Sequence, residues 1–189
     1  MTHDIARRCG FRTERLSVGD WRRLSDRHGL DLVDVISEVL TPATTIALPP
    51  EWQGEFDRER AACWMEARDT ESPTLLVVEA EAAMAVGLMI LFESADRGNG
   101  DRIDVRLGYV LAEEAWGRGL ATELVAGLVT WARSEPSIGS VSAGVADGNE
   151  ASVRVLVKTG FELAGSRSGE RFYSVAVGPS QSGARLRSD

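Results

Sequence analysis

Two short stretches of the chain carry the residue types that could bind an anionic cosubstrate. The first is the run from Trp116 to Thr122, Trp-Gly-Arg-Gly-Leu-Ala-Thr, which follows the apolar run 103–111 and leads into a segment with helical periodicity. A strand, a glycine-bearing loop and a helix N-terminus in this order form an anion site, because first-turn N–H groups lack intrahelical partners and the helix dipole is positive there. Gly117 and Gly119 allow an anion to approach the backbone. The pattern predicts a pyrophosphate site made of backbone groups.

Two familiar nucleotide-binding loops do not fit this stretch. A P-loop requires Gly-x-x-x-x-Gly-Lys-Ser/Thr, and the chain has a single lysine, Lys158. The dinucleotide fingerprint requires a third glycine at a fixed offset after Gly117 and Gly119, and the sequence lacks it. Taken alone, the stretch is equally compatible with an ordinary glycine turn before a helix.

The second stretch is residues 149–161, which predicts a short helix that begins at Asn149 and ends at Gly160. The two stretches together resemble the GNAT family of N-acetyltransferases, in particular its ribosomal-protein (RimJ/RimL-type) branch. Residues 107–123 are similar to that branch's Gly-Tyr-x-Leu-x-x-x-x-Trp-Gly-x-Gly-x-Ala-Thr-Glu run, and residues 149–161 to its Asn-x-x-Ser…Lys-x-Gly-Phe run. Residues 12–16 resemble its Thr-Glu-Arg-Leu first strand.

The resemblance implies that acetyl-CoA is the cosubstrate and that a primary amine attacks its thioester directly in a ternary complex. It assigns the pyrophosphate to the backbone of the glycine loop, the pantetheine arm and thioester carbonyl to the end of the preceding strand, and further contacts to the second stretch. The residues so assigned are Tyr109, Val110, Leu111, Gly117, Arg118, Gly119, Leu120, Ala121, Thr122, Asn149 and Ser152. For Arg118 a solvent-facing position is an equal alternative, and for Asn149 the alternative is simple helix capping.

The general acid and base are not fixed by the sequence. Many members of the family carry a tyrosine on the short helix, four residues before its final glycine, to protonate the leaving thiolate, and this position is Leu156 here. Tyr173 is a candidate acid or acceptor-site residue, although a strand tyrosine more often packs. Asp104 and Glu93 are candidate general bases on strands beside the cleft. Positioning and desolvation without a dedicated acid are the alternative.

Acceptor and function retain alternatives. The acceptor amine is either a protein N-terminus or a small molecule, and the donor could carry a longer acyl chain. A coenzyme A-binding module without turnover is the second hypothesis, which the leucine at 156 keeps open. A toxin that acetylates aminoacyl-tRNA is disfavoured, because the net charge of −8 opposes binding of nucleic acid. Trp52 is a candidate for either a pocket or a homodimer contact.

The composition indicates one globular domain. The chain has 189 residues, of which 43% are hydrophobic and 26% charged, and no apolar run reaches the ~20 residues of a membrane span. Two cysteines and two histidines suggest neither a disulfide framework nor a metal site. We expect a cytoplasmic protein with no metal and no membrane contact. The domain is expected at 11–177, with tails at 1–10 and 178–189.

Periodicity predicts an α+β fold with a single mixed, mostly antiparallel central sheet flanked by helices. Strands are expected at 11–18, 74–79, 83–93, 103–111, 138–145, 161–167 and 171–177. Helices are expected at 21–28, 30–40, 51–68, 120–132 and 149–159. Residues 41–50 read as a proline-bearing loop, which either shapes the acceptor pocket or merely connects, and residues 94–101 as a hairpin loop.

Overall fold

The computed structural model describes residues 8–71, 73–93 and 102–178, and within them it shows one mixed sheet flanked by helices. The sheet order is β1-β2-β3-β4-β5-β6-β8-β7. Its strands are β1 (Phe11–Arg12), β2 (Leu16–Asp20), β3 (Thr74–Glu79), β4 (Met84–Glu93), β5 (Ile103–Leu111), β6 (Ile138–Ala146), β7 (Glu162–Arg167) and β8 (Glu170–Ala176). Every neighbouring pair is antiparallel except β5 and β6, which are parallel. The α+β fold expected from the sequence is confirmed.

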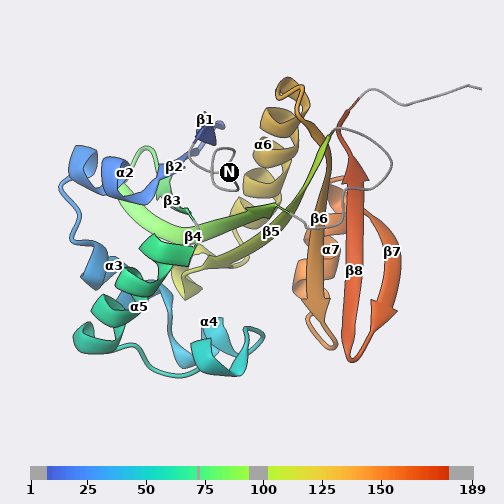
Figure 1. The fold of residues 1–189 in the computed structure, drawn as a ribbon. Helices are drawn as coiled ribbons and strands as arrows, with labels where there is room; N and C mark the ends of the chain where they lie inside the picture. The colour runs from blue at the N-terminus through green and yellow to red at the C-terminus, as the bar shows by residue number, and fades with distance from the viewer. Residues whose placement is uncertain (1–7, 72, 94–101, 179–189) are drawn as a thin grey trace, which may run out of the picture.

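Helices cover both faces of the sheet (Figure 1). The helices are α2 (Trp21–His28), α3 (Leu32–Val39), α4 (Pro42–Thr45), α5 (Arg58–Glu71), α6 (Leu120–Ser134) and α7 (Glu150–Lys158), with short 3-10 turns η1 (Pro50–Trp52) and η2 (Glu113–Ala115). One core lies between the sheet and α2, α3 and α5, and the other between the sheet and α6 and α7. Among the described residues, no helix is both long and apolar enough to cross a bilayer.

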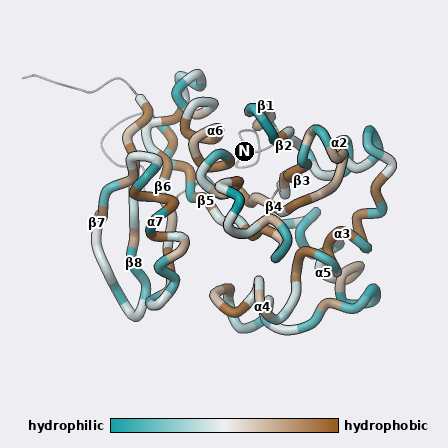
Figure 2. The backbone as a smooth tube through the Cα atoms, turned by 180° about the vertical axis from the view of Figure 1, so that it is seen from behind, coloured by the Kyte–Doolittle hydropathy of each residue, from teal (hydrophilic) through white to brown (hydrophobic). Residues whose placement is uncertain are grey.

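The apolar content is concentrated in the middle of the sheet. Residues Leu75 to Val78 of β3 are fully buried, because both faces of this strand are covered by helices. Every residue of β7, the edge strand, is exposed. Figure 2 shows the same contrast, with hydrophobic colour along β3 and β4 and hydrophilic or neutral colour along β7.

The sheet divides between β5 and β6. Their residue pairs run from Ile103 with Ile138 to Arg106 with Ser142 and stop there, although β5 continues to Leu111 and β6 to Ala146. Figure 1 shows the two strands side by side at their beginnings and separating toward their C-terminal ends. The inner edges of both strands are therefore unpaired beyond the last registered pair.

Gly87 keeps the other edge of β5 close to β4. It is paired with Leu111, and a side chain there would collide with the backbone carbonyl of Val110. A glycine inside a strand suggests a bulge or close backbone packing, and both are found here. Val77 of β3 pairs with Gly87 and Val78 with Ala85, so the register shifts beside Gly87 and Val86 is the extra residue of β4.

Three expected elements differ from the structure. The expected strand 11–18 is two strands, β1 and β2, joined by a turn in which the Thr13 hydroxyl accepts a hydrogen bond from the Leu16 N–H at 3.0 Å. The expected loop at 41–50 contains the helix α4, because Thr41 and Thr44 form a reciprocal capping box. The expected helix 51–68 begins at Arg58, after an irregular segment.

The ends of the chain and one connection are only partly described. The predicted loop at 94–101 and most of the predicted tails, residues 1–7 and 179–189, lie outside the described residues. Cys9, which the sequence placed in the N-terminal tail, is 3% exposed and packs into the core on the α6 side of the sheet.

Candidate functional site

The loop before α6 presents a row of backbone donors. Within the described residues, the backbone N–H groups from Gly117 to Thr122 have no acceptor, and the first amide bonded into the helix is Glu123, which donates to the Gly119 carbonyl at 3.1 Å. Gly117 and Gly119 have φ of 70° and 78°, in the left-handed region that favours glycine. The helix N-terminus has no side-chain cap. These donors and the helix dipole together suit an anion.

Ion pairs hold this loop in place. Glu123 accepts hydrogen bonds from the Thr13 hydroxyl at 2.6 Å and from the Arg15 backbone N–H at 2.7 Å, and it pairs with the Arg15 guanidinium at 2.6 Å. The same guanidinium donates to the Arg118 carbonyl at 2.9 Å. Partial burial would raise the pKa of Glu123, but these hydrogen bonds outweigh it and lower the pKa below its usual value. The carboxylate therefore stays charged and keeps the β1–β2 turn against α6.

Arg118 is not directed at an anion in this structure. Its guanidinium pairs with Glu79 at the end of β3, and the Glu79 side chain is 15% exposed. The Arg118 side chain is 43% exposed, so solvent weakens this pair. The loop's positive character therefore comes from its backbone rather than from this side chain.

The predicted strand residues line the gap between β5 and β6. Tyr109, Val110 and Leu111 lie beyond the last pair with β6, so no neighbouring strand covers their inner edge. The Leu111 carbonyl accepts a hydrogen bond from the Trp116 indole N–H at 2.9 Å, which ties the end of β5 to the glycine loop. The Ile103 N–H donates toward β6 and the Ala112 N–H toward β4, so by the alternation of a strand the backbone groups of Tyr109 and Leu111 face the gap and those of Val110 face β4. The Tyr109 N–H and C=O and the Leu111 N–H are therefore the groups of β5 that a ligand in the gap can reach.

The second predicted stretch closes the gap from the α7 side. Asn149 caps α7, because its side-chain oxygen accepts from the Ser152 N–H at 3.1 Å. Capping, the alternative to a coenzyme contact, is thus observed, and the coenzyme contact stays a prediction. The amide nitrogen of Asn149 makes no hydrogen bond within the described residues. The Ser152 hydroxyl faces the Tyr109 hydroxyl across 3.5 Å, which is long for a hydrogen bond. The structure thus brings Tyr109, Asn149 and Ser152 to one end of the gap.

The sequence predicted that Tyr109 contacts the coenzyme, but it did not identify the Tyr109 side chain as a candidate catalytic group. Its phenol crosses from β5 to α7, and burial raises its pKa above the usual value. The hydroxyl is therefore protonated at neutral pH and able to donate a proton. The sequence contains only Tyr109 and Tyr173, so counting tyrosines would have identified it as a candidate acid.

Comparisons with known proteins agree with this geometry. Residues 23–162 match the family described as an acetyltransferase (GNAT) domain. The chain belongs to the GNAT family of acetyltransferases. This membership confirms the family and the class of enzyme that the sequence motifs predicted.

Individual GNAT relatives are distant in sequence. An uncharacterized N-acetyltransferase of Bacillus subtilis, YoaA, is 26% identical over 139 residues, which cover 73% of this chain and 66% of that protein, just under two thirds of its length. A Bacillus anthracis GNAT acetyltransferase structure has a TM-score of 0.70 at 16% identity, covering 89% of this chain and 99% of its own. A ribosomal-protein-S5-alanine acetyltransferase from Vibrio fischeri has a TM-score of 0.57 at 16% identity over 89% and 96% of the chains. These structural likenesses concern the fold.

The other candidate catalytic residues of this GNAT chain lie away from the gap. Asp104 precedes the last β5–β6 pair and accepts a hydrogen bond from the Ser140 hydroxyl at 2.5 Å. Glu93 of β4 lies opposite Val105 of β5 in the strand register, in the part of the sheet where β5 and β6 are still paired. Tyr173 is 5% exposed and packs in the core between β8 and α7. Its position favours a packing role, and Leu156 is likewise buried in that core.

On the face of the sheet opposite α6 and α7, the strands beside the gap carry glycines, Gly108 on β5 and Gly144 on β6. A side chain at Gly108 would meet nothing within 4 Å, so space remains above β5 there. Gly144 of β6 is covered by the ion pair between Arg106 and Glu170, whose atoms are 3.1 Å apart. Phe172 packs against the Arg106 guanidinium, 5.6 Å from the ring centre. Arg106, Glu170 and Phe172 were not predicted as site residues from the sequence. The alternation of small and apolar residues along β6 did indicate a face of the sheet with little side-chain volume.

Proposed function

We propose that the protein is an acetyl-CoA-dependent N-acetyltransferase that transfers the acetyl group to a primary amine, either a protein N-terminus or a small molecule. The observation that carries the proposal is the row of unpaired N–H groups from Gly117 to Thr122 beside the unpaired edges of β5 and β6. In this proposal, the pyrophosphate binds the row and the pantetheine arm pairs with the gap-facing backbone of β5 at Tyr109 and Leu111. Family membership supports acetyl transfer, and the amine acceptor belongs to the proposal.

We infer that Tyr109 takes the role that many family members give to a tyrosine at the position of Leu156. The attacking amine forms the new C–N bond at the thioester carbonyl, the C–S bond breaks, and the leaving thiolate needs a proton. The Tyr109 phenol reaches α7 at Ser152, one helical turn before Leu156, so its position rather than its acidity supports this role. Tyr109 gives its proton to the thiolate, the amine nitrogen loses a proton to solvent as the amide forms, and Tyr109 regains a proton from solvent.

The acceptor amine then approaches from the open face over Gly108, opposite α7. The Arg106–Glu170 pair and the Phe172 ring form one wall of this approach. The short helix α4 lies near the other end of the gap, where the Thr41 hydroxyl donates to Glu113 at 2.7 Å. This arrangement gives the segment 41–50 a part in shaping the acceptor site.

The test is a thiol-release assay with acetyl-CoA and a panel of amines: N-terminal peptides, polyamines, amino acids and aminoglycosides. We expect release with one class, which names the acceptor. Absence of release across the panel, combined with a rise in melting temperature on adding coenzyme A, would favour the binding module without turnover. Absence of both release and thermal shift would refute the site.

Single substitutions to phenylalanine separate the two candidate tyrosines. Tyr109→Phe should lower kcat by roughly a hundredfold, the low end for loss of a general acid, at unchanged affinity for coenzyme A. Tyr173→Phe removes the other tyrosine hydroxyl, in the core beside α7. If Tyr173→Phe has the larger effect on kcat, the assignment of the acid to Tyr109 is wrong.

A further inference from the structure

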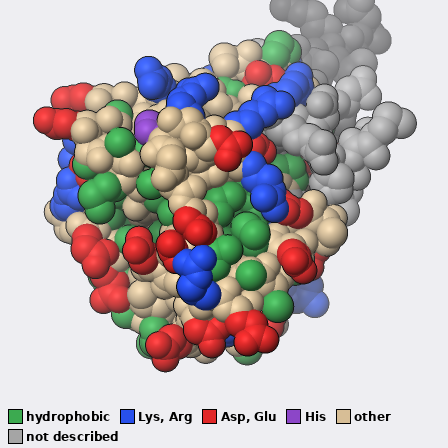
Figure 3. All heavy atoms as spheres, turned by 90° about the vertical axis from the view of Figure 1, so that its left-hand side faces the viewer, with side chains coloured by type: hydrophobic (Ala, Val, Ile, Leu, Met, Phe, Trp, Pro, Cys, Tyr) green, Lys and Arg blue, Asp and Glu red, His purple; other side chains and the backbone are tan. Residues whose placement is uncertain are grey.

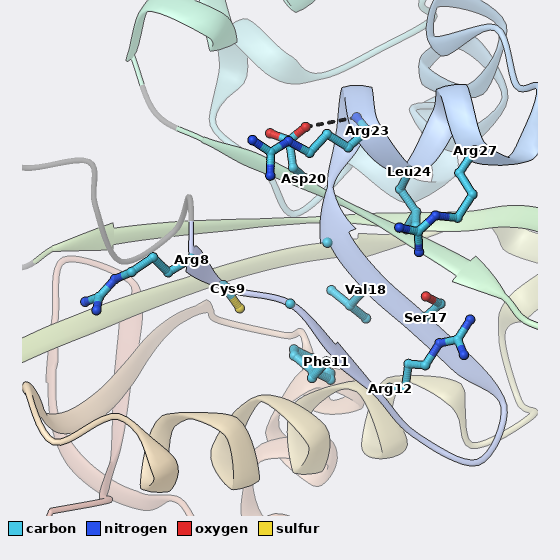
Figure 4. Close-up of a pocket in the computed structure, with 12 residues that line it drawn as sticks. Arg8, Cys9, Phe11, Arg12, Ser17, Val18, Asp20, Arg23, Leu24 and Arg27 are labelled. Atoms are coloured by element: carbon cyan, nitrogen blue, oxygen red, sulfur yellow. Dashed lines mark hydrogen bonds between the residues drawn. The ribbon is translucent and has the colours of Figure 1, made fainter.

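A second concave site lies on the edge of the sheet, between β1, β2 and α2. The groove has a volume of about 380 Å³ and is lined by residues 8–12, 17–20, 23, 24 and 27. It shares no residue with the glycine loop or the β5–β6 gap. Figure 4 shows Arg12 and Arg27 on either side of the Ser17 hydroxyl at one end of the groove, and Arg8, Asp20 and Arg23 toward the other.

The lining is strongly basic in an acidic protein. It contains Arg8, Arg12, Arg23 and Arg27 against one carboxylate, Asp20, whereas the whole chain has a net charge of −8. Figure 3 shows most Lys and Arg side chains of the face it presents in its upper part, with Asp and Glu side chains more numerous below. The lining of the groove is thus locally positive in a chain that is negative overall.

Three of the four guanidinium groups have no partner within the described residues. Arg12, Arg23 and Arg27 form neither an ion pair nor a side-chain hydrogen bond there, while Arg8 pairs with Glu135 at 3.7 Å. Asp20 is occupied as the cap of α2, accepting the Arg23 backbone N–H at 2.9 Å. The three guanidinium groups are exposed to solvent, and within the described residues no carboxylate competes for them, so they are available to bind an anion.

The floor of the groove leaves room for such an anion. A side chain at Gly19 would meet nothing within 4 Å, so a ligand can approach the β2 backbone there. The Ser17 hydroxyl makes no hydrogen bond within the described residues and is positioned to donate to an oxyanion. Burial, together with nearby Glu135, raises the pKa of the Cys9 thiol, so the thiol stays neutral and adds no opposing charge.

We propose that this groove binds a small oligophosphate, either a free pyrophosphate or tripolyphosphate or the phosphate chain of a nucleotide. The guanidinium fork matches phosphate oxygens in a bidentate manner, and two or more arginines around one cavity suit a multiply charged phosphate chain. The volume of about 380 Å³ suits a small molecule, and the net charge of −8 of the whole chain opposes binding of an extended polyanion such as nucleic acid.

The experiment measures binding of tripolyphosphate and of ATP to the full chain by titration calorimetry, with and without saturating coenzyme A. In the proposed function coenzyme A binds at the α6 N-terminus, so phosphate binding that persists at saturating coenzyme A belongs to another site. We expect Arg12→Glu and Arg27→Glu each to weaken binding at least roughly tenfold, as loss of a charged hydrogen bond predicts. Arg167→Glu, on the opposite edge strand β7, makes the same change in net charge and is expected to have little effect.

The comparison of ligands identifies the source of the phosphate. Equal affinity for tripolyphosphate and ATP means that the phosphate chain alone is recognised, whereas tighter binding of ATP means that the groove also holds a nucleoside. Binding that coenzyme A abolishes, or that Arg167→Glu weakens as much as Arg27→Glu, would overturn the proposal. So would binding of single-stranded nucleic acid with no measurable binding of either small phosphate.

Discussion

Substituting Gly119 tests the pyrophosphate site most directly. Its φ of 78° makes any other residue strained, at a cost of about 1 kcal/mol in the free energy of unfolding. A side chain would nevertheless fit, because its nearest neighbour, Nη2 of Arg15, is 3.7 Å away at ordinary contact distance. Gly119→Ala and Gly119→Glu should therefore both fold, with melting temperatures about 2–4 °C below wild type.

The two variants should differ in their affinity for coenzyme A. Gly119→Glu places a carboxylate where the pyrophosphate is expected, and two like charges about 4 Å apart repel by about 4 kcal/mol at an effective dielectric constant of about 20. Screening by salt and by Arg15 reduces this penalty. We expect the Kd for coenzyme A to rise at least about a hundredfold for Gly119→Glu, and only severalfold for Gly119→Ala.

The matched control is Gly29→Glu, at the C-terminal cap of α2. Gly29 also has a left-handed φ, of 67°, and open space around it, so the variant has the same strain and the same added charge away from the loop. Titration calorimetry with coenzyme A and thermal melting are measured on all three variants. If Gly119→Glu binds coenzyme A within threefold of wild type, or if Gly29→Glu loses as much affinity, the assignment of the pyrophosphate to this loop is refuted.

Four further substitutions probe the scaffold. Asn149→Ala should cost about 1 kcal/mol of stability as a lost cap and weaken coenzyme A binding about fivefold, and a lower melting temperature at unchanged Kd would restrict Asn149 to capping. Gly87→Ala should destabilise by about 1–3 kcal/mol in denaturant unfolding, because its methyl group meets the Val110 carbonyl, whereas Gly108→Ala has open space and should change stability little. Glu123→Gln should lower the free energy of unfolding, and the full loss should be seen above pH 4.5, the ordinary pKa of a glutamate. The difference from wild type should disappear as the pH falls through the lowered pKa of Glu123. Unfolding curves at several pH values test this trend.

Elements with sharp local boundaries were predictable from the sequence. The helix α2 matches its predicted bounds, because Asp20 caps its start and Gly29, with a left-handed φ, ends it. The start of α5 was missed, although Asp57 accepts the Arg60 N–H at 2.8 Å and is therefore a readable capping residue. The two prolines, which the sequence analysis placed just before this helix, start the 3-10 turn η1 instead, with Pro49 as its N-cap and Pro50 as its first residue. Competing local signals at one boundary explain this error.

The candidate site divides in the same way. The glycine loop and the cap of α7 follow from residues adjacent in the chain, and both are placed as the sequence predicted. The approach of the Tyr109 hydroxyl to Ser152 joins residues 43 apart, and it depends on where β5 and β6 separate. No periodicity in one sequence encodes that point of separation. Long-range geometry of this kind is what the structure adds.

The division of the sheet also sets how the molecule opens. Within the described residues, β6, β7 and β8 join the rest of the sheet through four registered pairs between β5 and β6. A part held by so few ladder bonds is expected to open as a local unit, with faster amide exchange than β3 or β4. A ligand that spans both inner edges would join the two parts, so bound coenzyme A should slow exchange in β6 and α7 together. The cosubstrate would then act as a mechanical link across the sheet as well as an acyl donor.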